Sequence, residues 1–350
     1  MEKVIGLITC NYSTKESSPL TESRPAASLP YFGRYRMVDF ALSNLVNCGI
    51  RTVGMVMPYN YRSIIDHVGS GKDWDLDRKN GGLFILPGSA FGTSRTGARF
   101  LLRDLIHNKA YFTRSTSDAV IFSTANFVFN VDLNKVYDAH KASGADVTAF
   151  DVEDGRVQGV HHGATFGESM FLDCFVIGRQ LLLDMFDWYA ATDYLDLFEA
   201  MAGDFGRVNV RTYDYDGYVA PVFSKRAFYR ANMDLLNPRV TAELFPEERS
   251  IKTKTHDTPP AKFEVGSRVI NSAVSSGDRI YGSVSDSILG RNVIVEAGAT
   301  VRNSIVMQGC VVKSGARVEN AIVDRANVVP AGTELRGTPE DVLIKEKAHE

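Results

Sequence analysis

The chain has 350 residues, of which 44% are hydrophobic and 23% charged, so it is long enough for one large domain and a smaller one. The formal net charge of −3, with basic residues scattered along the chain, argues against nucleic acid or a membrane surface as a partner. The four cysteines lie far apart with no CxxC pair, a pattern that suggests neither a zinc site nor a disulfide framework. We therefore expect a cytoplasmic protein.

The start of the chain predicts a strand and no signal peptide, because its apolar stretch is short and runs directly into polar residues. Up to residue 236, short β-branched runs alternate with helical patterns. Strands are predicted at 4–9, 52–57 and 119–122, and helices at 38–46, 98–106 and 133–142. This alternation predicts an α/β domain over residues 1–236 with a mostly parallel sheet.

A change of pattern begins at Asn237-Pro238. From there to Thr258-Pro259-Pro260 the chain is polar, is interrupted by prolines and shows no sustained period. We therefore predict a linker over residues 237–262.

The C-terminal part contains an internal repeat of 17 residues. Segments 287–303, 304–320 and 321–337 superimpose without a gap. Three sets of residues recur in register: Ile288, Ile305 and Ile322; Ile294, Val311 and Val328; and the turn glycines Gly298, Gly315 and Gly332. Three short strands per coil predict a triangular parallel β-helix over 263–340, followed by a tail at 341–350. The alternative is a sandwich of β-hairpins, which would not need three gapless copies.

Three further segments, combined with this organisation, carry a resemblance to a known family. They are RYRMVDFALSNLVNCGIRTVGMVMPY (34–59), WDLDR (74–78) and HKASGADV (140–147). With them the chain resembles bacterial ADP-glucose pyrophosphorylase over nearly its whole length. The resemblance implies a Rossmann-like nucleotidyltransferase domain, a left-handed parallel β-helix and a tetramer. Members of the family make ADP-glucose and pyrophosphate from ATP and glucose 1-phosphate.

The triphosphate-binding elements of that family are altered here. The family has a glycine-rich loop after the first strand, whereas residues 7–13 of this chain, LITCNYS, contain no glycine. Glycine lets backbone N–H groups surround phosphate oxygens, because it has no Cβ and accepts positive φ. A gapless count from Tyr35-Arg36 places the family's lysine at Ala26 and its neighbouring arginine at Arg24. Arg24 is therefore a candidate for residual phosphate binding.

The metal-binding elements implied by the resemblance are altered as well. Asn126 stands where one metal-binding aspartate is expected, and Pro221 stands where the second is expected. Mg²⁺ prefers anionic oxygen ligands, so we expect neither a metal site nor another cofactor. The family's sugar-contacting Glu-Lys-Pro segment has no counterpart near His161-His162-Gly163. The resemblance is thus to a non-catalytic paralogue in bacterial glycogen synthesis, with no catalytic residues of its own.

Such a paralogue modulates a catalytic ADP-glucose pyrophosphorylase subunit within a hetero-oligomer, for which we expect a tetramer. Arg34, Arg36 and Arg51 match basic residues that the family uses to bind anionic effectors near the domain junction. We expect them to bind a phosphorylated sugar or a nucleotide, since arginine donates bidentately to phosphate. The alternative is that these arginines form salt bridges with surface carboxylates.

Two other functions stay open from the sequence. The first is a weakly active adenylyltransferase that uses relocated ligands such as Asp132 or Asp214. The second is a hexapeptide-repeat acyltransferase, because parallel β-helices often carry that chemistry. Those enzymes commonly use a histidine as general base, and no histidine occurs between His256 and His349.

Overall fold

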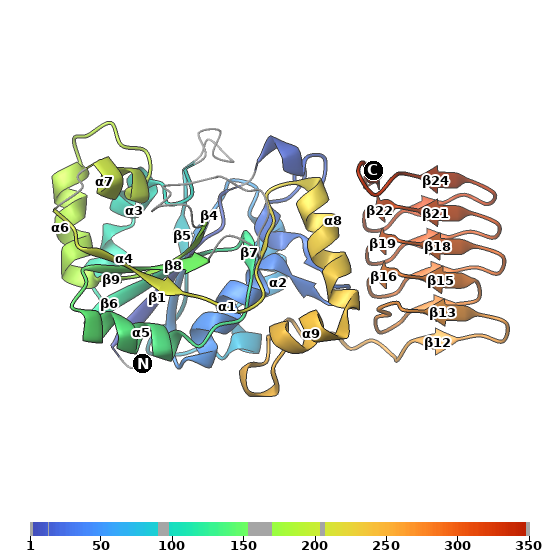
Figure 1. The fold of residues 1–350 in the computed structure, drawn as a ribbon, viewed down its shortest axis with the longest axis horizontal. Helices are drawn as coiled ribbons and strands as arrows, with labels where there is room; N and C mark the ends of the chain where they lie inside the picture. Colours follow the sequence, from blue (N-terminus) through green and yellow to red (C-terminus); the bar gives the residue numbers. More distant parts are fainter. Residues whose placement is uncertain (1–2, 13, 90–97, 153–169, 204–206, 348–350) are drawn as a thin grey trace.

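A seven-stranded sheet forms the centre of the N-terminal domain (Figure 1). The computed structural model describes residues 3–12, 14–89, 98–152, 170–203 and 207–347. The strands lie in the order β10-β8-β9-β6-β1-β4-β5. Their bounds are β1 Val4–Thr9, β4 Thr52–Met57, β5 Gly82–Pro87, β6 Ala119–Thr124, β8 Val147–Val152, β9 Met170–Gly178 and β10 Val210–Asp214. All neighbours are parallel except β9, which is antiparallel to both β6 and β8. The predicted mostly parallel sheet is therefore confirmed.

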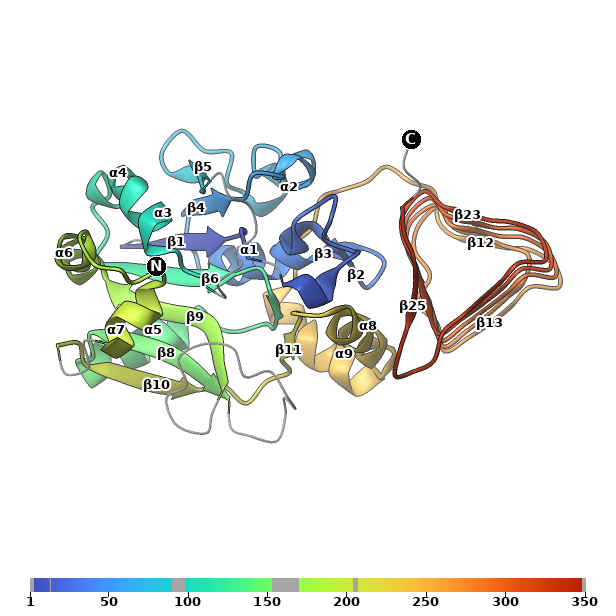
Figure 2. The same ribbon diagram turned by 90° about the horizontal axis from the view of Figure 1, so that it is seen from above.

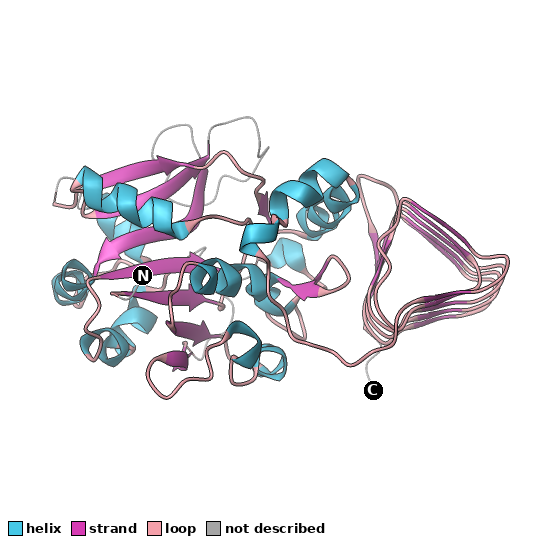
Figure 3. Cartoon of the chain, turned by 90° about the horizontal axis from the view of Figure 1, so that it is seen from below, coloured by secondary structure: helices cyan, strands magenta, loops and turns pink. Residues whose placement is uncertain are grey.

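Helices cover both faces of this sheet (Figure 3). On one face pack α1 Met37–Asn47, α2 Arg62–Val68 and α5 Leu133–Ser143. On the other pack α3 Leu102–His107, α4 Lys109–Thr113, α6 Arg179–Tyr189 and α7 Leu197–Gly203. Helix α3 begins later than the predicted residue 98, because Leu101 still forms a β-bridge with Asp196. Both faces of the sheet are buried, as parallel sheets require.

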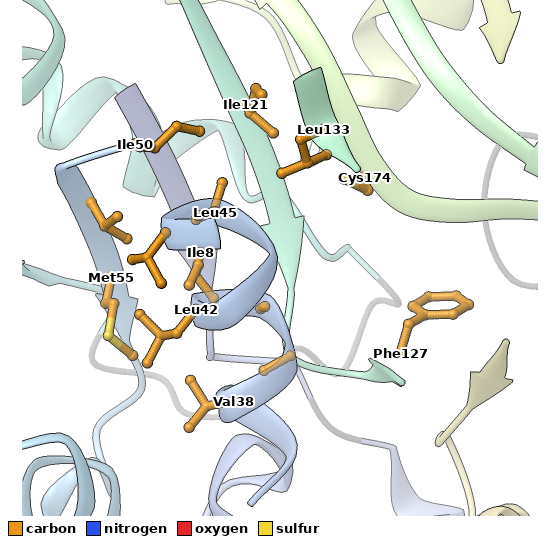
Figure 4. Close-up of a cluster of buried hydrophobic side chains, with 14 of the residues drawn as sticks. Ile8, Val38, Leu42, Leu45, Ile50, Met55, Ile121, Phe127, Leu133 and Cys174 are labelled. Atoms are coloured by element: carbon orange, nitrogen blue, oxygen red, sulfur yellow. The ribbon is translucent and has the colours of Figure 1, made fainter. Parts of the chain in front are cut away.

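Helix α1 contributes several side chains to the buried hydrophobic cluster on the first face of the sheet (Figure 4). Val38, Leu42 and Leu45 recur at helical spacing and face the sheet, where they pack near Ile8 of β1. The helix approaches β1 closely at Gly6, where a Cβ atom would lie 2.7 Å from Leu45 Cδ1. The absence of a side chain at Gly6 therefore lets α1 pack directly against β1.

The C-terminal strands wind into a triangular prism of three parallel sheets (Figure 2). Ile288, Ile305 and Ile322 stack in register, as do Ile294, Val311 and Val328, which confirms the predicted repeat. Gly298, Gly315 and Gly332 turn the chain at φ values of 75°, 72° and 69°. The strands are β12 Lys262–Phe263, β13 Arg268–Ile270, β14 Arg279–Ile280, β15 Ser283–Ser285, β16 Ile288–Leu289, β17 Ile294–Val295, β18 Thr300–Arg302, β19 Ile305–Val306, β20 Val311–Val312, β21 Arg317–Glu319, β22 Ala321–Val323, β23 Val328–Val329, β24 Glu334–Arg336 and β25 Leu343–Lys345.

The two domains share one apolar cluster. Helix α8 (Lys225–Met233) lies along the β-helix sheet β16-β19-β22-β25 (Figures 1 and 2). Phe228 of α8 belongs to the same buried cluster as Ile305 and Ile322 of the β-helix. Tyr229 adds a hydrogen bond of 2.7 Å from its hydroxyl to the Asn303 carbonyl. The domains are therefore joined by packed side chains as well as by the connecting segment.

Two predicted boundaries differ from the structure. The predicted linker contains helix α9, Pro238–Leu244, and the turn η5, Glu247–Arg249. Helix α9 begins where the Asn237 side chain accepts a hydrogen bond from Arg239 N and Pro238 occupies the first turn, signals that favour a helix N-terminus. The predicted tail contains β25, which pairs with β22 and belongs to the β-helix.

Candidate functional site

Asn126 and Pro221 lie side by side at the carboxyl end of β6. Asn126 is in the turn between β6 and the short strand β7, Phe127–Val128. Pro221 of β11, Ala220–Pro221, pairs with Phe127, and Val222 N donates to the Asn126 carbonyl at 2.8 Å. Ligands of open α/β sheets bind at the carboxyl ends of strands. The two positions implied by the resemblance therefore do meet at such an edge, without a carboxylate on either residue.

Asn126 is held inside a polar network. Its side chain is buried, and Nδ2 donates to the Tyr12 carbonyl at 3.4 Å. Its backbone N–H donates to Thr124 Oγ1 at 3.4 Å, and Thr124 Oγ1 donates in turn to Asp173 Oδ2 at 3.4 Å. A buried carboxylate of β9 is thus two hydrogen bonds from Asn126.

Asp173 is paired with Arg99, a contact that the sequence did not predict. Arg99 Nε lies 2.5 Å from Asp173 Oδ1, and both side chains are buried. Asp173 adopts a φ of 54°, which is uncommon for a residue other than glycine. Burial raises the pKa of Asp173, and the Arg99 guanidinium opposes that rise. The signal in the sequence is a lone carboxylate inside the apolar run of β9, FLDCFVIG.

Aromatic rings pack around this ion pair. The Arg99 guanidinium lies 5.9 Å from the ring centroid of Phe223. Tyr12 and Phe127 make edge-on contacts with Phe223 at centroid distances of 5.6 and 5.2 Å. The side chains of Cys10, Asn11 and Tyr12, which follow β1, are all buried. The loop that lacks glycine is therefore built into the packing at this edge.

Arg24 is not placed where a nucleotide phosphate would meet it, which corrects the prediction for this residue. Its side chain is fully buried, and Nη2 lies 2.8 Å from Asp324 of the β-helix. Ala26 is also buried, within the apolar cluster that the two domains share. This segment faces the β-helix, so Arg24 acts as an ionic contact between domains. Burial lowers the pKa of Arg24, and Asp324 opposes that change.

A cavity of about 620 Å³ lies at the domain junction. Arg34 is the one member of the predicted effector cluster among its lining residues. Lys254 and His256 come from the segment that connects the domains, and Arg291 comes from the β-helix. The other lining residues are apolar, aromatic or hydroxyl-bearing: Phe32, Tyr35, Thr241, Phe245, Thr253, Thr255, Ala273, Val274, Ser275 and Ser276.

This cavity is cationic, because Arg34, Lys254 and Arg291 line it and none of its described lining residues is an aspartate or glutamate. Burial lowers the pKa of Arg291, and Arg34 lowers it further. Burial also lowers the pKa of His256, with Arg291 and Lys254 acting in the same direction. The Thr253 hydroxyl is buried without a hydrogen-bond partner among the described residues. An anion with hydroxyl groups would match both the charge and this donor.

Arg36 and Arg51 lie outside the cavity, so the predicted cluster of three arginines does not form. Arg36 Nη1 donates to the Ser63 carbonyl at 2.6 Å, and burial lowers the pKa of Arg36 to about 10. Arg51 lies beyond the other end of α1, where Nη1 donates to the Val46 carbonyl at 2.8 Å. The 11 residues of α1 separate the two arginines by about 16 Å of helix.

The remaining candidates are dispersed. Asp132 caps α5 by accepting from Asn134 N at 3.0 Å. Asp214 ends β10, which β8 and β9 separate from β6. His161-His162-Gly163 lie outside the described residues.

Within the described ranges, no three or more histidine, cysteine, aspartate or glutamate side chains group in a way that could hold a metal ion. Nor does any helix there combine the length and apolar character required to cross a bilayer.

Comparison with known proteins places this architecture in a family. Residues 17–159 match the family Nucleotidyl transferase, and residues 259–341 match the family GlmU-like, C-terminal hexapeptide. The chain is 32% identical to Glycogen biosynthesis protein GlgD of Bacillus subtilis over 86% of its length and 83% of that protein. Identity to the GlgD protein of Geobacillus stearothermophilus is 34%, over 85% and 83% of the two chains. A Glucose-1-phosphate adenylyltransferase of Pseudothermotoga lettingae is 28% identical, over 86% and 77%. The chain therefore belongs to the nucleotidyltransferase family that contains the GlgD glycogen biosynthesis proteins and the glucose-1-phosphate adenylyltransferases.

Proposed function

We propose that this protein is a regulatory subunit for ADP-glucose synthesis in bacterial glycogen formation, with little or no adenylyltransferase activity of its own. The GlgD relatives support a role in glycogen biosynthesis. The adenylyltransferase relatives indicate the reaction that a catalytic partner performs. One observation carries the proposal: Asn126 and Pro221, which lie side by side at the carboxyl end of β6, both lack a carboxylate.

That arrangement does not fit a magnesium-nucleotide complex. Mg²⁺ is held by hard anionic oxygens, whereas Asn126 offers one neutral oxygen and Pro221 offers none from its side chain. The nearby carboxylate of Asp173 is already neutralised by Arg99. We therefore assign no step of chemistry to a metal at this site.

We expect a severe loss of adenylyltransferase activity, because nucleotidyl transfer depends mainly on electrostatic stabilisation and positioning. Removal of a single stabilising group costs about 10²–10³ in rate. With two such groups absent, we expect ADP-glucose synthesis at least about a thousandfold below that of a catalytic relative.

The test is pyrophosphate release by the purified full chain with ATP, glucose 1-phosphate and Mg²⁺. A catalytic glucose-1-phosphate adenylyltransferase serves as the active control. We expect that Asn126→Asp alone does not restore activity, because Pro221 and the Arg99–Asp173 pair remain. Turnover by the wild-type chain within tenfold of the control would contradict the proposal.

The cationic cavity supports a regulatory role. Its volume of about 620 Å³ is within the range of small-molecule sites, about 300–1,000 Å³. Arg34 and Arg291 are contributed by different domains, so an anion between them would bind to both domains at once. We propose a phosphorylated sugar or a nucleotide as the ligand, which would couple the domain junction to the state of a catalytic neighbour. Couplings of this kind are worth about 1–3 kcal/mol, or roughly 5- to 150-fold in affinity.

The chain provides a matched pair of arginines to test this site. Calorimetric titration with AMP and with glucose 6-phosphate should show binding by wild type that Arg34→Ala weakens at least about tenfold. Arg51→Ala, which removes an arginine outside the cavity, should bind as wild type does. Equal weakening by both substitutions would refute the assignment.

We also propose that the regulated assembly is a hetero-tetramer with a catalytic subunit. Co-expression with a glucose-1-phosphate adenylyltransferase from the same organism, followed by affinity purification on a tag of this chain, tests it. Recovery of an active complex whose effector response differs from that of the catalytic subunit alone is the expected result. Absence of the catalytic subunit from the purified material would contradict the partnership.

A further inference from the structure

One residue that lines the junction cavity can change its charge near neutral pH. His256 lies in the connecting segment and lines the cavity together with Arg34, Lys254 and Arg291. The residue is exposed, so its imidazole can exchange a proton with solvent. Histidine changes its charge between about pH 5 and 8, whereas arginine and lysine side chains ordinarily keep theirs over this range. The positive charge of the cavity therefore depends on the protonation of His256.

The chain around His256 is anchored on both sides. Before it, Thr255 donates to Asp73 Oδ1, from its backbone N–H at 3.0 Å and from its hydroxyl at 2.8 Å. After it, Thr258 Oγ1 lies 2.6 Å from Ser276 Oγ of the β-helix. The segment then runs on to β12, the first strand of the β-helix (Figure 2). Contacts to both domains thus hold the backbone of His256 at the wall of the cavity.

The charged groups around His256 oppose its protonation in the empty cavity. Partial burial lowers its pKa, and Arg291, Lys254, His67 and Arg36 lower the pKa further. These four groups belong to the β-helix, the connecting segment, α2 and the residue that precedes α1. Cations from every neighbouring part of the junction therefore act on this imidazole in the same direction.

The carboxylates near the cavity are directed to other partners. Asp39 Oδ1 lies 2.6 Å from His67 Nε2, and both side chains are buried. Asp73 accepts the two hydrogen bonds from the connecting segment, and Asp257, which follows His256, is not a lining residue. Burial raises the pKa of Tyr35, which lines the cavity, so its hydroxyl stays neutral. A bound anion would therefore be the first negative group beside the imidazole among the described residues of the lining.

We propose that His256 is an anion-binding residue of this cavity and that it takes up a proton when a phosphate group binds. The inference rests on the proposed regulatory ligand and adds proton exchange to it. A phosphate between Arg34 and Arg291 places negative charge beside the imidazole, which offsets the repulsion from the surrounding cations. The proton comes from solvent, and the imidazolium N–H then donates to a phosphate oxygen as a charged donor.

Anion binding is therefore tighter at low pH. Below the pKa of His256 in the empty cavity, the imidazolium is present before and after binding, and the affinity is highest. Between that pKa and the higher pKa in the occupied cavity, each anion takes up one proton, and the dissociation constant rises about tenfold per pH unit. Above both values His256 is neutral in either state, and the affinity is lowest. From pH 6 to pH 8 we expect a loss of at least about fivefold in affinity.

Calorimetric titration of the full chain with AMP tests this coupling. Titrations at pH 6, 7 and 8, each in two buffers of different ionisation enthalpy, count the protons taken up per AMP. The phosphate of AMP itself titrates near about pH 6, so the count is compared with His256→Gln, in which the contribution of AMP is the same. We expect wild type to take up more protons than His256→Gln. His107→Gln, which removes an exposed histidine at the end of α3, should behave as wild type does.

A nuclear magnetic resonance titration follows the same proton directly. The imidazole signal that is absent from His256→Gln should titrate at a higher pH with AMP than without it. Equal proton counts in wild type and His256→Gln, with an unshifted signal, would overturn the role of His256 and leave the regulatory cavity intact. Loss of proton uptake in His107→Gln would also overturn it. If AMP does not bind to wild type at any of these pH values, both the proton coupling and AMP as a ligand are wrong. Circular dichroism verifies that each variant is folded.

Discussion

The ion pair between Arg24 and Asp324 allows a quantitative test of how the domains are joined. The two residues are 300 positions apart, with Arg24 side chain 0% exposed and Asp324 side chain 6% exposed. Nε and Nη1 of Arg24 have no hydrogen-bond partner among the described residues. Asp324→Asn keeps the size of the side chain but leaves the buried guanidinium without a counter-charge. We expect this substitution to lower the free energy of unfolding by about 3–5 kcal/mol, the usual cost of breaking a buried pair at one side.

The assay is urea unfolding followed by circular dichroism, with an exposed pair of the same β-helix as control. Arg317 and Glu334 are 3.5 Å apart, and their side chains are 72% and 60% exposed. Glu334→Gln should therefore cost less than about 1 kcal/mol. The double variant Arg24→Met with Asp324→Leu should recover most of the stability lost in Asp324→Asn, because apolar replacement of both partners leaves no buried charge. If Asp324→Asn costs no more than Glu334→Gln, the argument from burial is wrong.

Two further predictions concern the β-helix. Burial raises the pKa of Asp278 from 3.8 to about 7, so charging this residue opposes folding, and stability should fall by up to about 4 kcal/mol as pH rises from 4 to 7. Asp278→Asn should remove that part of the pH dependence in thermal unfolding at a series of pH values, and an unchanged slope would contradict it. Gly315 has a φ of 72°, so Gly315→Ala should cost about 1–2 kcal/mol of unfolding free energy although nothing crowds the added methyl. Gly178→Ala, at a glycine of negative φ in equally open space, is the control and should be neutral or slightly stabilising.

Much of the fold could be predicted because its signals are local or periodic. The 17-residue repeat fixes which residues stack, and Ile288, Ile305 and Ile322 do so in register. Helix α9 was missed because its signals are only an N-cap asparagine and a first-turn proline, followed by a single short amphipathic stretch. Seven residues are too few to show a helical period against a polar background.

The candidate sites were predicted less well, because their partners are distant in the sequence. Arg24 was wrongly assigned to phosphate binding, since nothing local indicates a partner in the last third of the chain. Arg51 was grouped with Arg34 because both match basic residues of the resembled family, but helix α1 separates them and only Arg34 lines the cavity. Arg291 occupies a position of the 17-residue repeat that Gln308 and Arg325 also occupy, so the repeat does not distinguish it. Only the packing of the β-helix against the N-terminal domain shows that Arg291 lines the cavity.

The apolar cluster shared between the domains restricts how parts of this protein can be exchanged with those of its relatives. Ile305 and Ile322 of the β-helix are buried against Phe228 of helix α8, which precedes the connecting segment. A cut in the connecting segment would expose Ile305 and Ile322 on the β-helix fragment and Phe228 on the N-terminal fragment. A chimera with a paralogue should therefore stay soluble more readily when the junction lies before Ser224, where α8 and the β-helix are inherited together, than when it lies in the connecting segment.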